Sequence, residues 1–157
     1  MAIRIVLIGI GATVCIDLWA LLLRGLFGVR SLDYCLLGRW LSHMRRGRIM
    51  HESIAAAARQ PHECKIGWTA HYSIGVVFAV IFTLLVKDAW LHRPTLVPAL
   101  VFGLATVAVP FLTMQPAFGL GIAARRTARP WAARIKSVAT HTVFGAGLYV
   151  SAVLISR

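Results

Sequence analysis

Acidic residues are scarce in this sequence: five Asp and Glu stand against 17 Lys and Arg, which gives a formal net charge of +12 in 157 residues. In a soluble protein such an excess of positive charge would indicate nucleic-acid binding. Here the positive residues lie in polar segments beside long apolar runs. The imbalance therefore predicts topology signals and contacts with anionic lipid headgroups, with no nucleic-acid partner.

Cysteine is also scarce. Cys15, Cys35 and Cys64 make an odd count without a Cys-x-x-Cys spacing, and Cys15 lies inside an apolar run. We therefore expect no disulfide framework. A signal peptide is not expected either, because the first apolar run is too long, Asp17 interrupts it and no small-residue cleavage site follows. The run is interpreted as a retained helix.

Long apolar runs dominate what is present, and 59% of the residues are hydrophobic. Four runs of about 20 residues are each long enough to cross a hydrocarbon core of about 30 Å as a helix. The predicted fold class is all-α, an integral membrane four-helix bundle formed by one polytopic domain over residues 1–157. The expected boundaries are about 3–27, 66–87, 94–115 and 135–156 for the helices, and 28–65 and 117–134 for the two cytoplasmic loops.

An amphipathic pattern occupies the first loop, residues 28–65. Apolar residues recur at helical spacing over 32–44, with Arg39 and His43 on or beside the other face. This pattern predicts a helix that lies in the membrane interface between the first two spanning helices. The Ala-rich run 51–58 predicts about two further helical turns.

The positive residues also predict an orientation. Thirteen of the 17 lie in or beside the loops 28–65 and 117–134, and four lie on the other side. Short loops rich in Lys and Arg stay in the cytoplasm. Both loops are therefore expected to be cytoplasmic, and both termini are expected on the opposite side of the membrane.

Four polar residues interrupt the spanning helices at a similar depth under this orientation. Asp17 is about 21 Å along the first helix, given a rise of about 1.5 Å per residue. His71 and His141 lie a few residues inside helices that enter from the cytoplasm, and Gln115 ends the third helix. The sequence therefore predicts a polar cluster of Asp17, His71, Gln115 and His141 that opens toward the cytoplasm.

The sequence also contains a short internal repeat. Residues 12–14 and 105–107 share the sequence Ala-Thr-Val, and both His71 and His141 are followed four residues later by glycine. The repeat predicts two similarly oriented halves, each with two spanning helices.

Three hypotheses explain the cluster. A carboxylate inside a spanning helix costs roughly 2.5–3.5 kcal/mol and needs a partner. The first hypothesis is a small carrier or transport-associated protein, expected to be a homo-oligomer because four helices rarely enclose a pathway alone. The second is a metal-dependent membrane enzyme acting on a lipid or small molecule, with a divalent transition metal on Asp17, His71 and His141. The third is a structural or accessory subunit in which Asp17 only hydrogen-bonds a histidine.

Loop residues could extend a metal site. His43, His51 and Glu52 would add ligands if the first loop folded beneath the bundle, although the simpler interpretation is that they are solvated. The enzyme hypothesis is the weaker one, because the sequence has no His-Glu-x-x-His motif and no persuasive nucleophile with a His and an acid.

Several motifs are spread over nearly the whole chain. They are Gly11-Ala12-Thr13 with Asp17-Leu18-Trp19; Asp33-Tyr34 with Gly38-Arg39-Trp40 and His43-Met44; Gly67-Trp68 with His71-Tyr72; Arg93-Pro94-Thr95-Leu96; and Met114-Gln115-Pro116 with Gly121-Ile122-Ala123-Ala124-Arg125-Arg126-Thr127. Together they resemble a family of small bacterial inner-membrane proteins defined by a domain of unknown function, number 2938. The resemblance implies four spanning helices in a bacterial inner membrane, so the termini are expected in the periplasm. It implies no activity and supplies no catalytic or binding residues.

Overall fold

The computed structural model describes residues 1–156, except for the side chain of Asp88. No strand occurs in this part of the chain. Four helices are long and apolar enough to cross a membrane, at Ala2–Phe27, Glu63–Lys87, Leu96–Ala117 and Pro130–Ile155. The predicted all-α class with four membrane-length helices is confirmed, and the chain is a multi-pass membrane protein.

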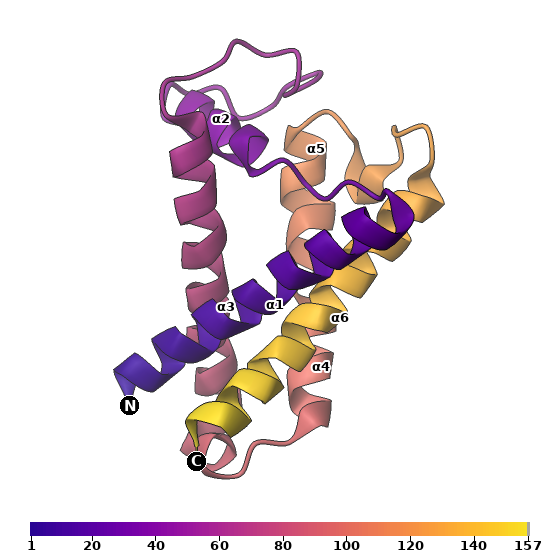
Figure 1. The fold of residues 1–157 in the computed structure, drawn as a ribbon. Helices are drawn as coiled ribbons and strands as arrows, with labels where there is room; N and C mark the ends of the chain where they lie inside the picture. The colour runs from indigo at the N-terminus through magenta and orange to yellow at the C-terminus, as the bar shows by residue number, and fades with distance from the viewer. Residues whose placement is uncertain (157) are drawn as a thin grey trace. The chain divides into compact units, whose positions relative to one another are not determined.

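The first helix, α1, covers Ala2–Phe27 and is a single uninterrupted helix, drawn in indigo in Figure 1. It ends at Gly28, whose φ of 63° is in the left-handed region and whose N–H donates to the carbonyl of Arg24. Glycine adopts this conformation at no steric cost, which explains why the helix stops here. The predicted boundaries of this helix are within one residue of the observed ones.

The loop helix α2 covers Tyr34–Met44. Asp33 caps it by accepting a hydrogen bond of 2.9 Å from the N–H of Cys35, as expected of an acidic N-cap. The expected helical turns at residues 51–58 are absent, and the chain forms turns there instead. The helical propensity of this Ala-rich run is overridden by tertiary contacts, which are described below.

The second spanning helix, α3, covers Glu63–His92, so it starts three residues before the predicted boundary at 66. The predicted end of this helix is at about residue 87. The membrane-length helix ends at Lys87, as predicted, and a second helical segment continues to His92 after the non-helical backbone of Lys87.

The third span is broken into pieces. It consists of α4 (Leu96–Ala105), the π-helix η1 (Pro110–Met114) and α5 (Gln115–Ala117). The irregularity is expected at Pro110, because proline has no N–H to donate to the preceding turn. A short 3-10 helix, η2 (Ile122–Ala124), follows. The last span, α6 (Pro130–Ile155), starts five residues before the predicted position 135.

The chain is divided into two compact units. The first contains Met1–Ser31, Tyr72–Thr106 and the chain from Val138 onward, and the second contains Leu32–His71 and Val107–Ser137. The first unit has an apolar core that includes Phe82, Phe144 and Leu148. The core of the second joins Leu37 of α2 to Phe118. The prediction of one polytopic domain remains a prediction.

Glycines bring helices of the first unit close together. A Cβ atom at Gly9 of α1 would lie 2.6 Å from the Cα of Val76 in α3, and one at Gly103 of α4 would lie 2.5 Å from the Cα of Gly145 in α6. Such contacts between backbones are typical of membrane helices. They put α1 against α3 and α4 against α6, which are the pairs that the internal repeat predicts to be equivalent.

Large apolar side chains lie exposed along the spans. Leu84 is 75% exposed, Val97 69% and Leu18 60%. In water so much exposed apolar surface would favour aggregation, whereas lipid chains solvate it without cost. The outward faces of these helices are therefore suited to contact with lipid.

Candidate functional site

Asp17 of α1 is paired with Tyr72 of α3 in the first unit. The hydroxyl of Tyr72 donates a hydrogen bond of 2.8 Å to the Asp17 carboxylate, and both residues are half-buried. One turn away, a Cβ at Gly75 would overlap the hydroxyl of Thr13, which itself donates to the carbonyl of Gly9 at 2.8 Å. This close approach of the two helices lets the short Asp17 side chain reach its partner.

A second polar pair joins α4 to α6. The hydroxyl of Thr106 lies 2.8 Å from Nδ1 of His141 and donates its proton to the carbonyl of Gly103. A hydroxyl has one proton, so Nδ1 of His141 must be the donor in this contact. Nε2 of His141 is then left as the acceptor of a neutral imidazole.

The other two residues of the predicted cluster lie in the second unit. The ring of His71 stacks on Tyr34, with ring centroids 3.9 Å apart, and lies edge-on to Trp68 at 5.9 Å. Gln115 is 6% exposed. Its Nε2 donates to the hydroxyl of Ser137 at 3.3 Å, while its buried Oε1 has no hydrogen-bond partner in residues 1–156.

The predicted cluster is therefore distributed over both units. Asp17 and His141 have partners in the first unit, and His71 and Gln115 have partners in the second. Convergence of all four side chains remains a prediction. No group of three or more His, Cys, Asp or Glu side chains in the described part of the chain is placed to hold a metal ion.

His43 and His51 are buried, so the interpretation that these two histidines are solvated is wrong. His43 is 7% exposed and His51 is 6% exposed, and their ring centroids lie 5.1 Å apart. Nε2 of His43 donates to the carbonyl of Ala58 at 2.9 Å. The side chain of Glu52, in contrast, is exposed as expected.

Burial disfavours the charged form of His51. Neither ring nitrogen has a well-formed hydrogen bond among the described residues. Burial lowers the pKa of His51 below the ordinary value of 6.5, and the charges of Arg48 and His43 lower it further, whereas the carbonyls of Ala117 and Ile49 act in the opposite direction. The net lowering of the pKa favours an uncharged ring beside Arg48.

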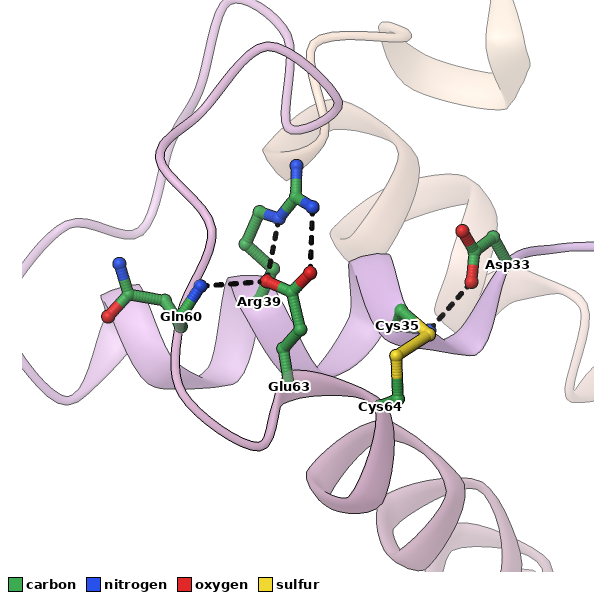
Figure 2. Close-up of a disulfide and its surroundings, with 6 residues drawn as sticks. All are labelled: Asp33, Cys35, Arg39, Gln60, Glu63 and Cys64. Carbon is green, nitrogen blue, oxygen red and sulfur yellow. Dashed lines mark hydrogen bonds and ion pairs between the residues drawn. A yellow bond between two sulfur atoms is a disulfide. The ribbon is translucent and has the colours of Figure 1, made fainter.

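The centre of the second unit is an ion pair that sequence reasoning missed. Arg39 of α2 was expected on the polar face but is 5% exposed. Figure 2 shows its guanidinium facing the Glu63 carboxylate, with Nε to Oε2 at 2.9 Å and Nη2 to Oε1 at 2.8 Å. These hydrogen bonds raise the pKa of Arg39 above its ordinary value, so it stays charged. The N–H of Gln60 adds a third bond to Glu63, at 2.9 Å.

Arg39 also binds the loop backbone. Its Nη1 donates to the carbonyls of Ile54, Ala55 and Ala57 at 3.2, 3.0 and 3.2 Å. The expected helical turns at 51–58 do not form, and three carbonyls of this stretch instead converge on one nitrogen of Arg39. The signal available in the sequence was the presence of Glu63, one of only five acids, 24 residues after Arg39.

A disulfide joins Cys35 to Cys64 beside this ion pair (Figure 2), so the expectation that the cysteines do not pair is wrong. Cys15 remains a free thiol. The pairing depends on the packing of α2 against the start of α3, where a Cβ at Gly38 would overlap the carbonyl oxygen of Glu63. Spacing along the chain does not reveal that contact.

Comparison with known protein families gives a match that covers most of the chain. Residues 6–155 match the family described as "Protein of unknown function (DUF2938)". This chain belongs to the DUF2938 family. No curated protein and no solved structure matches it. The family resemblance expected from the motifs is confirmed, and the description of the DUF2938 family gives no activity, so the site is interpreted from its chemistry.

Proposed function

We propose that this DUF2938 protein is a small carrier or transport-associated protein of the bacterial inner membrane, in which Asp17 and Tyr72 form the central ionisable pair. The observation that supports this most is their hydrogen bond of 2.8 Å between two spanning helices. Ionisable residues inside spanning segments are expensive and most often belong to ion or solute pathways.

A phenol is a suitable partner for a carboxylate that changes its protonation state. Tyr72 donates to the ionised carboxylate, and a protonated Asp17 still offers a carbonyl oxygen to the same hydroxyl. The pair can therefore persist through uptake and release of a proton.

His141 and Thr106 provide a second polar contact in the same unit. The assigned tautomer leaves Nε2 of His141 as an acceptor. An acceptor imidazole can take a proton or accept a hydrogen bond from a solute. Two polar pairs on four neighbouring segments of the first unit are consistent with a pathway rather than with a single structural contact.

The orientation is part of the proposal. The charge count places the loops 28–65 and 117–134 in the cytoplasm and both termini in the periplasm, with the exposed Arg125, Arg126 and Arg129 against anionic headgroups. The disulfide favours the opposite orientation, because stable disulfides are typical of oxidising compartments such as the periplasm. We give the charge count precedence because it rests on 17 residues in several segments.

A C-terminal fusion tests the orientation. Alkaline phosphatase at the C-terminus should be active, since it folds in the periplasm, whereas green fluorescent protein there should be dark. The reverse pattern would overturn the orientation and assign the loop 28–65 to the oxidising side.

Proton flux tests the function. Purified protein in liposomes with an internal pH dye and an imposed pH gradient should dissipate the gradient faster than protein-free liposomes. Asp17→Asn should remove this flux, and Thr113→Val, which alters an exposed hydroxyl in another span, should retain it. Flux equal to that of the wild type in a folded Asp17→Asn variant, or no flux from the wild type, would count against the carrier and favour an accessory subunit.

A further inference from the structure

The loop of the second unit contains a pocket that the proposed function does not use. Its volume is about 420 Å³. That size is within the range of small-molecule sites, roughly 300–1,000 Å³. The lining residues are Arg48, Met50, Glu52, Ser53, Ala56 and Ala57.

Hydrogen bonds hold the backbone around this pocket in place. Nη1 of the buried Arg39 binds three carbonyls of the stretch 54–57, including that of Ala57. The N–H groups of His51 and Ile54 donate to the carbonyls of Ala117 and Phe118 at 3.0 and 3.1 Å. The pocket is therefore shaped before any ligand arrives, which lowers the entropic cost of binding.

The contact with the segment after α5 is especially close. A Cβ at Gly119 would overlap the carbonyl oxygen of Glu52, and the φ of Gly119 is 89°, which favours glycine. The backbone of Glu52 thus packs directly against Gly119. This leaves the Glu52 side chain on the exposed side, where the pocket lies.

Two side chains of opposite charge, Arg48 and Glu52, line the pocket. Neither Arg48 nor Glu52 makes an ion pair among the described residues, and both side chains are exposed. Ser53 adds a hydroxyl to the lining, and Met50 and Ala56 add apolar surface. A guanidinium matches an oxyanion, and a carboxylate with a hydroxyl matches a primary ammonium.

We propose that this pocket binds a phosphoethanolamine group, with the phosphate on Arg48 and the primary ammonium on Glu52 and Ser53. The zwitterionic headgroup of phosphatidylethanolamine carries both charges. The loop lies just before the spanning helix that starts at Glu63, and its neighbours Ile49 and Met50 are 53% and 62% exposed. Apolar side chains beside a charged pocket suit a lipid whose headgroup binds while its chains stay in the bilayer.

Ligand titration of the purified protein in detergent tests the proposal. The probes are short-chain phosphatidylethanolamine, short-chain phosphatidylcholine and soluble O-phosphoethanolamine, each followed by the shift of the unfolding temperature. The ethanolamine lipid should give a saturable rise at a concentration at least about tenfold below that of the choline lipid, because a trimethylated ammonium has no N–H to donate to Glu52.

Variants test the contributions of Arg48 and Glu52 to binding separately. Glu52→Gln should remove the preference for the ethanolamine lipid over the choline lipid. Arg48→Gln should weaken the binding of both lipids about equally. Arg45→Gln, an exposed arginine outside the pocket, should bind like the wild type. All three substitutions leave the Arg39–Glu63 pair intact, so the unfolding temperature without ligand serves as the control for folding.

The soluble probe identifies the source of the ligand. Binding of O-phosphoethanolamine as tight as that of the lipid would assign the site to a free solute, and much weaker binding would assign it to the membrane lipid. Equal affinity for ethanolamine and choline lipids, or a Glu52→Gln variant that keeps the preference, would overturn the proposal. Neither result depends on Asp17, so failure here and failure of the carrier are distinguishable.

Discussion

The guanidinium of Arg39 and the carboxylate of Glu63 face each other through two hydrogen bonds of 2.9 and 2.8 Å, with side-chain exposures of 7% and 11%. This pair joins α2 to the start of α3 and, through the third nitrogen of Arg39, fixes the loop between them. The Arg39 side chain therefore holds the backbone of residues 54–57, part of which lines the pocket.

Removing one partner should be costly. Breaking a buried ion pair leaves an uncompensated charge and typically costs about 3–5 kcal/mol. Glu63→Gln is expected to lower the free energy of unfolding by that order, measured by thermal unfolding in detergent, and Arg45→Gln should leave it unchanged because Arg45 is exposed. Equal stability of the two variants would show that the pair contributes little.

Close packing of α2 on α3 predicts intolerance of a single methyl group. In Gly38→Ala the Cβ would overlap the carbonyl oxygen of Glu63, so α2 must move. Overpacking of this kind typically costs about 1–3 kcal/mol. The matched control is Gly25→Ala, whose Cβ meets nothing within 4 Å and should be neutral or stabilising. Equal unfolding temperatures for both alanine variants would contradict the packing.

The disulfide should stabilise the oxidised protein. Cys35 and Cys64 are separated by 29 residues, and closing a loop of that length is worth about 3–4 kcal/mol in the chain-entropy model. Dithiothreitol should therefore lower the unfolding temperature of the wild type and of Cys15→Ala, but not that of Cys35→Ser. A wild type that does not respond to the reductant would argue against the bond.

Acid should destabilise the protein through His51. The folded ring has a lowered pKa, whereas in the unfolded chain it takes up a proton near the ordinary pKa of 6.5. The unfolded state then binds more protons just below pH 6.5, so stability falls as the pH decreases through that value. In His51→Gln this part of the pH dependence should vanish. If the unfolding temperatures of the wild type and of His51→Gln change with pH in parallel, His51 does not cause the loss of stability.

The contact between Tyr72 and Asp17 should be worth less than the buried ion pair. Side-chain hydrogen bonds between membrane helices average about 0.6 kcal/mol and reach about 1.7. Tyr72→Phe is expected to lose that much stability while also changing the pH dependence of proton flux. Tyr149→Phe is the control, because the Tyr149 hydroxyl makes no hydrogen bond among the described residues. If both variants have the same stability and the same pH dependence of proton flux, the contact between Tyr72 and Asp17 contributes to neither.

The sequence by itself determined the four spans and the small helix between the first two. Length and apolar character act locally, because the bilayer requires about 20 apolar residues whatever the neighbouring helices do. The same reasoning identified Asp17 as an anomaly, since a carboxylate is costly wherever it stands in a span. The motifs along the chain also sufficed to identify the family.

Only the tertiary structure decided which residues are partners. Tyr72 donates to Asp17, Glu63 pairs with Arg39 from 24 residues away, and Cys35 reaches Cys64. These pairings depend on helix register and on glycines that let backbones meet, and neither follows from composition or periodicity. A shift of one residue in a helix rotates a side chain by about 100°, so partner choice is set by packing rather than by sequence distance.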